Sequence, residues 1–150
     1  MTTTPLITGH VGLNVTNLER STDFYRQVFD LDEVNASAED GRKYALLGRE
    51  GQLVLTLWQQ SDSAFDAATP GLHHLSFQAP DMDAVRAAET RLRELGARFF
   101  HDGVVAHSES ANSGGIFFAD PDGIRLEIFA PTGGQGAPVP TADAPTCGFF

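Results

Sequence analysis

Residues 9–18 read GHVGLNVTNL and residues 73–82 read HHLSFQAPDM, so a short pattern with a histidine at its second position occurs twice in the chain. The two histidines, His10 and His74, lie 64 positions apart. After each histidine, apolar and polar residues alternate with a period of two, which is typical of a strand with one face in the core and one face free. The repeat therefore predicts two related modules, each opening with a strand that carries a histidine on its polar face.

The residues that follow each of these strands predict the rest of the module. Apolar residues at helical spacing predict one helix from Leu18 to about Asp30 and another from near Asp81 to Leu95, with Gly96 as its stop signal. Strand-like segments then follow each helix, separated by turn residues. We expect these strands at 32–38, 43–47 and 52–58 in the first module, and at 97–100, 114–119 and 124–130 in the second.

This order predicts an α+β fold of two tandem βαβββ modules. The modules would span about residues 7–60 and 72–130 of a single domain, residues 1–130. Residues 101–113 form a polar loop suited to the rim or lid of a pocket. Residues 131–150 are rich in glycine, proline and alanine, so we expect a tail that is mobile or ordered only by docking.

The composition excludes several classes of function. The 150 residues carry a formal net charge of −10, and the ten basic residues are scattered, which argues against a nucleic-acid partner. No apolar run approaches the roughly 20 residues of a membrane span, and the first residues lack the features of a signal peptide. We therefore expect no membrane partner and a cytoplasmic location. The single Cys147 excludes an internal disulfide and a cysteine-based zinc site.

The last predicted strand supplies a third candidate ligand. Its alternation places Leu126 and Ile128 on the core face, so Glu127 faces the side expected for His10 and His74. A carboxylate among apolar neighbours needs a partner, and a metal shared with two imidazoles would serve. Two histidines and one carboxylate with open coordination positions suit non-haem Fe2+, and the same donors bind Mn2+, Ni2+, Co2+ or Zn2+.

A count along the two halves suggests why this site would be open. Glu127 lies four residues after Gly123, and Leu55 lies four residues after Gly51, which makes Leu55 the expected counterpart of Glu127. Three protein ligands facing an apolar wall leave room for water, oxygen or a chelating substrate, which favours catalysis over a closed structural site.

Other residues are candidates for binding or for proton transfer. His107 could supply an acid–base group from the polar loop, with a solvated loop residue as the alternative, which we also expect for His101. In the alternation of the strand that opens the second module, His73 falls on the same face as the core residue Leu75, so we expect it to be structural. The candidates for the wall of a substrate pocket, which could also be ordinary core or interface residues, are Asn14, Leu55, Trp58, Phe117 and Phe129.

These motifs together resemble the vicinal oxygen chelate superfamily. The resemblance rests on the double βαβββ pattern, the histidine that opens each half, and the run Asp120-Pro121-Asp122-Gly123 followed by Glu127, and it covers about residues 7–131. It implies a cupped mixed sheet around a metal or ligand site, with His10, His74 and Glu127 as metal-holding positions. It also implies pairing of modules between subunits, and hence a homodimer.

Comparison with individual groups of that superfamily limits the chemistry. Leu55 stands where glyoxalase I has a donor, and residues 112–117 lack the histidine and tyrosine of the extradiol dioxygenases. The fosfomycin-modifying transferases have a threonine where this chain has Gly12.

The leading hypothesis is a metal-dependent enzyme that binds a small apolar or aromatic substrate through two adjacent oxygens, with dioxygenase-like or glyoxalase- and lyase-like chemistry. The alternative is a non-catalytic protein that sequesters an antibiotic, as the bleomycin-resistance members do. In a third reading the fold is an interaction module that docks through residues 147–150.

Overall fold

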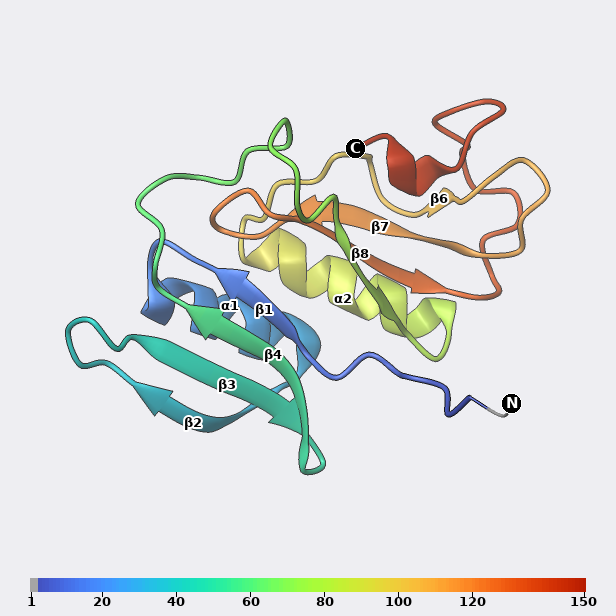
Figure 1. Cartoon of the computed structure of the whole chain (residues 1–150). Coiled ribbons are helices and arrows are strands. Elements are labelled where there is room, and N and C mark those ends of the chain that lie inside the picture. The colour runs from blue at the N-terminus through green and yellow to red at the C-terminus, as the bar shows by residue number, and fades with distance from the viewer. Residues whose placement is uncertain (1–2) are drawn as a thin grey trace. The chain divides into compact units, whose positions relative to one another are not determined.

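The repeated stretch forms the first strand of each module in the computed structural model, which describes residues 3–150. The chain divides after Ala64 into two compact units, one for each module. In the first unit, β1 pairs in parallel with β4, and β4, β3 and β2 pair antiparallel, so the sheet order is β1-β4-β3-β2 (Figure 1). The elements of this unit are β1 (Val11–Asn14), α1 (Leu18–Phe29), β2 (Asp32–Ser37), β3 (Tyr44–Arg49) and β4 (Gln52–Trp58).

The first helix begins and ends where its sequence predicts. The Asn17 side chain accepts a hydrogen bond from the Arg20 amide at 3.0 Å, which satisfies one of the free amides of the first turn. Asp30 adopts a left-handed conformation with φ of 52° and ends the helix. The buried side of α1, which includes Tyr25 and Val28, packs on β3 and β4. The core of this unit therefore lies between α1 and one face of its sheet.

The second unit repeats the arrangement with the order β5-β8-β7-β6, in which β5 pairs in parallel with β8. Its helix begins after Asp81, whose side chain accepts from the Ala84 amide at 2.9 Å. Together the two units confirm the prediction of an α+β fold built from two βαβββ modules. The elements of the second unit are β5 (Leu75–Gln78), α2 (Met82–Glu94), β6 (Val105–Ala106), β7 (Gly114–Ala119), β8 (Arg125–Ala130) and the short 3-10 helix η1 (Thr146–Gly148).

The strand predicted at 97–100 is wrong in its extent. This segment contributes only an isolated bridge between Phe99 and Phe118, with hydrogen bonds on either side of it. A bend at residues 100–103, with Gly103 at φ of 73°, interrupts the edge, and the chain returns to the other end of β7 as β6. The edge strand is thus split in two, and its second piece lies inside the segment predicted to be a polar loop.

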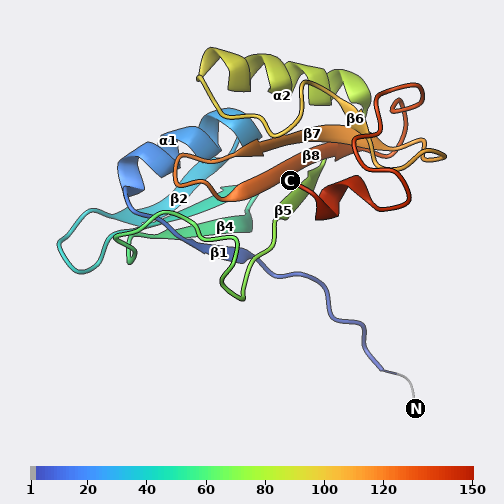
Figure 2. The ribbon, with the colours of Figure 1, turned by 90° about the horizontal axis from the view of Figure 1, so that it is seen from above.

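The second sheet has a different cover on each face. α2 packs on β7 and β8, and the segment that ends the chain lies on the opposite side of the sheet (Figure 2). The Thr146 amide donates to the His107 carbonyl at 3.0 Å, so this segment docks on its own unit.

The two long helices, α1 and α2, have 12 and 13 residues. Across residues 3–150, no helix combines the length and the apolar character needed to cross a membrane.

Candidate metal site

Glu127 lies on the face of the second sheet opposite α2, where the C-terminal segment docks; because no helix of the βαβββ module covers it, this face is called the open face. In the register of the sheet Glu127 is opposite Ser76 on β5 and Phe117 on β7. Its neighbours Leu126 and Ile128 point to the other face and are buried in the core. Only 3% of Glu127 is exposed, so its carboxylate needs partners to offset the cost of leaving water.

Three side chains with metal-binding atoms surround this carboxylate. His107 Nε2 lies 2.9 Å from Glu127 Oε1, and His74 Nε2 lies 4.0 Å from Glu127 Oε2. The Cys147 sulfur joins the group, and the ligand atoms of His74, Glu127 and Cys147 all lie within 4.8 Å of one another. Imidazole nitrogen, carboxylate oxygen and thiolate sulfur are the donor types that Zn2+, Fe2+ and Co2+ accept, so these residues fit a divalent transition metal.

In both histidines beside Glu127, the Nδ1 atom contacts a second side chain that fixes the ring. The Nδ1 atoms of His74 and His73 are 2.8 Å apart, and His107 Nδ1 lies 2.7 Å from the Ser113 hydroxyl. When His74 Nδ1–H donates to His73, the lone pair on His74 Nε2 faces Glu127. Outer contacts of this kind fix the tautomer and ring orientation of a ligating histidine.

Burial keeps two of these groups neutral. Burial lowers the pKa of His74 below its ordinary value, against the opposing attraction of Glu127. Burial also raises the pKa of the Cys147 thiol, and the negative charge of Glu127 raises it further. A neutral imidazole is the form that binds metal, whereas the thiol requires a cation beside it before it ionises readily.

Aromatic rings form the wall around the cluster. The Phe117 ring is fully buried and lies 5.2 Å from the Phe150 ring, centroid to centroid. Phe150 also lies 5.4 Å from His74, and Phe129 lies 5.4 Å from His107. The sequence placed Phe117 and Phe129 in the wall of a pocket, and both flank the histidines here.

In the first unit, the open face of the sheet carries Asn14 and Trp58, which are opposite each other on β1 and β4. Trp58 is 38% exposed. His10 is exposed and immediately precedes β1. The structure describes the two units separately, so it brings together His74, Glu127 and His107 but leaves His10, Asn14 and Trp58 as predictions for the same site.

The predicted equivalence of Leu55 and Glu127 is wrong. Leu55 is opposite Val11, on the face that packs against α1, and it is fully buried. Its side chain therefore belongs to the core beneath the helix, whereas the prediction placed it on the substrate side. A register shift between β3 and β4 leaves Val54 as an extra residue, so the position that corresponds to Glu127 is Thr56.

The expectations for the other histidines also need correction. His73 is exposed rather than part of the core, and its ring contacts His74 and Phe150. His101 is half-buried and packs edge-on against Phe117 at 5.5 Å, so it is not a solvated loop residue.

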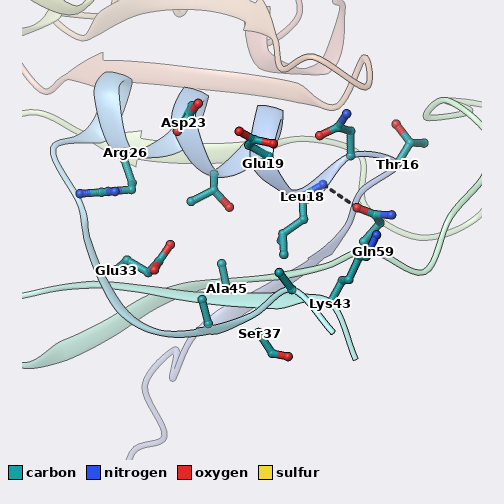
Figure 3. Close-up of a pocket in the computed structure, with 14 residues that line it drawn as sticks. Thr16, Leu18, Glu19, Asp23, Arg26, Glu33, Ser37, Lys43, Ala45 and Gln59 are labelled. Atoms are coloured by element: carbon teal, nitrogen blue, oxygen red, sulfur yellow. Dashed lines mark hydrogen bonds between the residues drawn. The ribbon is translucent and has the colours of Figure 1, made fainter. Parts of the chain in front are cut away.

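A separate cavity of about 690 Å³ lies in the first unit, between α1 and the β2–β3 part of the sheet (Figure 3). At one end the Leu18 amide donates to Gln59 Oε1 at 2.8 Å. Its charged lining residues are of both signs: Glu19, Asp23, Glu33, Arg26 and Lys43. None of the residues predicted for the metal or substrate site lines this cavity.

Comparison with known proteins identifies the family. The family model described as the Glyoxalase/Bleomycin resistance protein/Dioxygenase superfamily matches residues 7–128. The chain belongs to this superfamily. The match confirms the resemblance that the histidines and the final glutamate indicate.

Two curated relatives in the superfamily are enzymes by name. The chain is 28% identical over 125 residues to catechol-2,3-dioxygenase of Bacillus subtilis strain 168, a match that covers 81% of this chain and 40% of that protein. It is also 30% identical over 120 residues to the trivalent organoarsenical cleaving enzyme of Bacillus sp. strain MD1. That match covers 80% of this chain and 70% of that protein. The chain therefore spans two-fifths of the length of the first relative.

Among solved structures, a glyoxylase/bleomycin resistance protein/dioxygenase domain from Frankia sp. EAN1pec superimposes with a TM-score of 0.72. The two chains are 27% identical, and the match covers 89% of this chain and 98% of that one.

Two residues at this site were not placed there from the sequence: Cys147, which belongs to the cluster, and Phe150, which packs beside it. Cys147 and Phe150 lie far beyond the matched modules, in a segment whose composition indicates a tail. The one available signal was the pair of aromatic residues that ends the chain, which is unusual in a segment otherwise poor in large apolar side chains.

Proposed function

We propose that this protein is a metal-dependent enzyme of the superfamily that acts on a small apolar or aromatic substrate. The observation that carries the proposal is the buried carboxylate of Glu127 with two imidazole nitrogens beside it on the open face of a sheet. Members of the superfamily bind divalent metals. Fe2+ is the favoured ion, and Mn2+, Ni2+, Co2+ or Zn2+ suit the same donors.

The proposed ligand set is His10, His74 and Glu127. His74 and Glu127 meet in the second unit, while the place of His10 rests on its repeat position and on the family resemblance. When bound, the ion would act as a Lewis acid toward two adjacent oxygens of the substrate.

His107 is proposed to hold the Glu127 carboxylate and to exchange a proton at Nε2. Its Nε2 atom is within hydrogen-bond distance of Glu127, and the Ser113 hydroxyl fixes the opposite side of the ring. Phe117 and Phe129 are proposed to exclude water and to contact an apolar or aromatic part of the substrate, with Asn14 and Trp58 as the contribution of the first unit.

The type of reaction is proposed from the names of the two curated relatives. By name, one is a dioxygenase and the other an organoarsenical cleaving enzyme, so dioxygenase-like and lyase-like chemistry are both proposals for this chain. A homodimer is proposed on family resemblance.

A binding protein without catalysis is the second candidate. The half-buried rings of Phe100 and Phe150, whose centroids lie 5.1 Å apart, offer apolar contacts suited to a flat molecule. The net charge of −10 would attract a cationic ligand.

Metal analysis of the purified protein tests the leading proposal. We expect nearly one ion per chain in the wild type and loss of that ion in Glu127→Ala and His74→Ala. Glu109→Ala, which removes an exposed carboxylate, is the matched control and should retain the ion. Loss of the ion in His10→Ala as well would support the full ligand set.

Thermal unfolding provides a second readout. An ion present at about 100 times its Kd stabilises the folded state by about 2.7 kcal/mol, which corresponds to a rise in Tm of roughly 5–11 °C for a chain of this size. The rise should disappear in Glu127→Ala and persist in Glu109→Ala. If the wild type stays empty after reconstitution and shows no shift with any of the five ions, the enzyme proposal fails and drug-like cations should be screened instead.

A further inference from the structure

We propose that the C-terminal segment, residues 146–150, delivers Cys147 to the metal site as a thiolate ligand. The proposal rests on the proposed function, because it adds a donor to the site of His74 and Glu127. Its geometric basis is that the Cys147 sulfur, a His74 ring nitrogen and a Glu127 oxygen lie within 4.8 Å of one another. This cluster joins three separate parts of the second unit: the residue before β5, the middle of β8, and η1.

The residue before Cys147 is firmly anchored. Thr146 is fully buried, and its amide donates to the His107 carbonyl at 3.0 Å. Its hydroxyl donates to the Ala106 carbonyl at 2.7 Å, with the His107 carbonyl at 3.2 Å. Because His107 contacts Glu127 directly, the segment is bound to the same residue that positions the carboxylate. Cys147 therefore enters the cluster from a fixed backbone position.

The residue that ends the chain holds the other side of the segment. The Phe150 ring lies 5.1 Å from Phe100, 5.2 Å from Phe117 and 5.4 Å from His74. The Arg125 guanidinium lies over the same ring at 5.2 Å. Residues on both sides of Cys147 thus pack on the open face, and the thiol lies between an anchored threonine and a ring that contacts a proposed ligand.

The chemistry of the cluster explains why a thiol would be placed there. The Cys147 sulfur lies beside the Glu127 carboxylate and a His74 ring nitrogen, so a divalent ion among them would have three kinds of donor atom within reach. Such an ion attracts both the carboxylate and the sulfur. One metal–sulfur bond forms, the S–H bond breaks, and one proton leaves to the buffer. A single cysteine cannot build a cysteine-based zinc site, but it can complete a mixed site of nitrogen, oxygen and sulfur donors.

Titration of the full-length apoprotein with Co2+ under anaerobic conditions tests the inference, because a cobalt–thiolate bond gives a charge-transfer band in the near ultraviolet. The variants are Cys147→Ser, which keeps the size of the side chain, Cys147→Ala, and Glu127→Gln. We expect the band in the wild type and its absence in both Cys147 variants, together with at least a tenfold weaker affinity for Co2+. Circular dichroism of each variant establishes that the fold is retained.

The outcomes separate the two proposals. The thiolate ligand is overturned if the wild type binds Co2+ without the charge-transfer band and Cys147→Ser binds it with equal affinity. If Glu127→Gln loses Co2+ in the same experiment, the proposed metal site is still supported. No Co2+ binding by the wild type overturns both. As an independent readout, bound Co2+ should slow alkylation of Cys147 by iodoacetamide at least tenfold, and an unchanged alkylation rate in a Co2+-loaded protein contradicts the inference.

Discussion

The hydroxyl of Thr146 is expected to hold the C-terminal segment on the open face of the second sheet. The residue is fully buried, and its Oγ1 lies 2.7 Å from the Ala106 carbonyl oxygen. Thr146→Val keeps the shape of the side chain and removes the donor. A neutral hydrogen bond contributes about 0.5–1.5 kcal/mol, and a buried carbonyl left without its donor raises the cost to about 1–3 kcal/mol.

A loss of about 1.5–2 kcal/mol that affects the docked segment alone makes its opening roughly 10–30 times more frequent, since about 1.4 kcal/mol corresponds to a factor of ten. The half-buried Cys147, next in sequence, reports this opening through its rate of reaction with a disulfide reagent in native buffer. When the segment recloses faster than the reagent reacts, the rate follows the population of the open form. We therefore expect 10–30-fold faster labelling in Thr146→Val.

Thr141→Val is the matched control, because Thr141 lies in the same part of the chain with a half-buried side chain. It should label at the wild-type rate. Thermal unfolding of both variants shows whether the change is local, and we expect Tm to fall by only a few degrees in Thr146→Val. Labelling of Thr146→Val within twofold of the wild type would refute the reasoning, because the hydroxyl would then not hold the segment.

Three substitutions test the packing beneath the site. In a urea titration, Gly115→Ala should lower the free energy of unfolding by at least about 2 kcal/mol, because the added Cβ would lie 2.4 Å from the Ile128 carbonyl oxygen. Gly9→Ala is the control: its added Cβ would have no neighbour within 4 Å, so it should have no effect in the same titration. Asp120→Ala should cost about 2–4 kcal/mol by urea unfolding, since the carboxylate accepts from two buried amides at 2.8 Å. Phe117→Ala should cost about 3–5 kcal/mol in the same assay, as the ring is fully buried, and a cost below 1 kcal/mol would show that the open face is not packed as described.

The features predicted correctly from the sequence are those set by local interactions. Both helices begin where their apolar spacing predicts, at Leu18 and just after Asp81, and the side chains of Asn17 and Asp81 cap them. The alternation around Glu127 placed it on the face opposite Leu126, and the register of β8 agrees. Each of these outcomes depends on contacts within a few residues, so the pattern of one strand or one helix contains enough information.

The features that sequence reasoning missed depend on pairing between distant segments. A count from Gly51 cannot show that Val54 is an extra residue, because the shift exists only in the pairing of β4 with β3. Docking of residues 147–150 was one expectation, but the place where Cys147 and Phe150 dock depends on partners such as His74 and Phe117, which lie far away along the chain. Composition predicts a tail that is mobile or ordered only by docking, and the pairing of distant segments determines which face of the sheet receives it.

The corrected register also explains why an acidic side chain occupies the position of Glu127 in one module and not in both. At the counterpart of Glu127, the Thr56 hydroxyl accepts a hydrogen bond from the Trp58 indole at 2.9 Å. Across from it stands Gly12, where an added Cβ would come within 3.1 Å of the same hydroxyl oxygen. The first module therefore fills this position with its own hydrogen bond and leaves no space beside it. The second module has Ser76 and the buried carboxylate of Glu127 there, with two histidines within 4.0 Å of it, so the two copies share a backbone plan while only the second has an acidic side chain at this position.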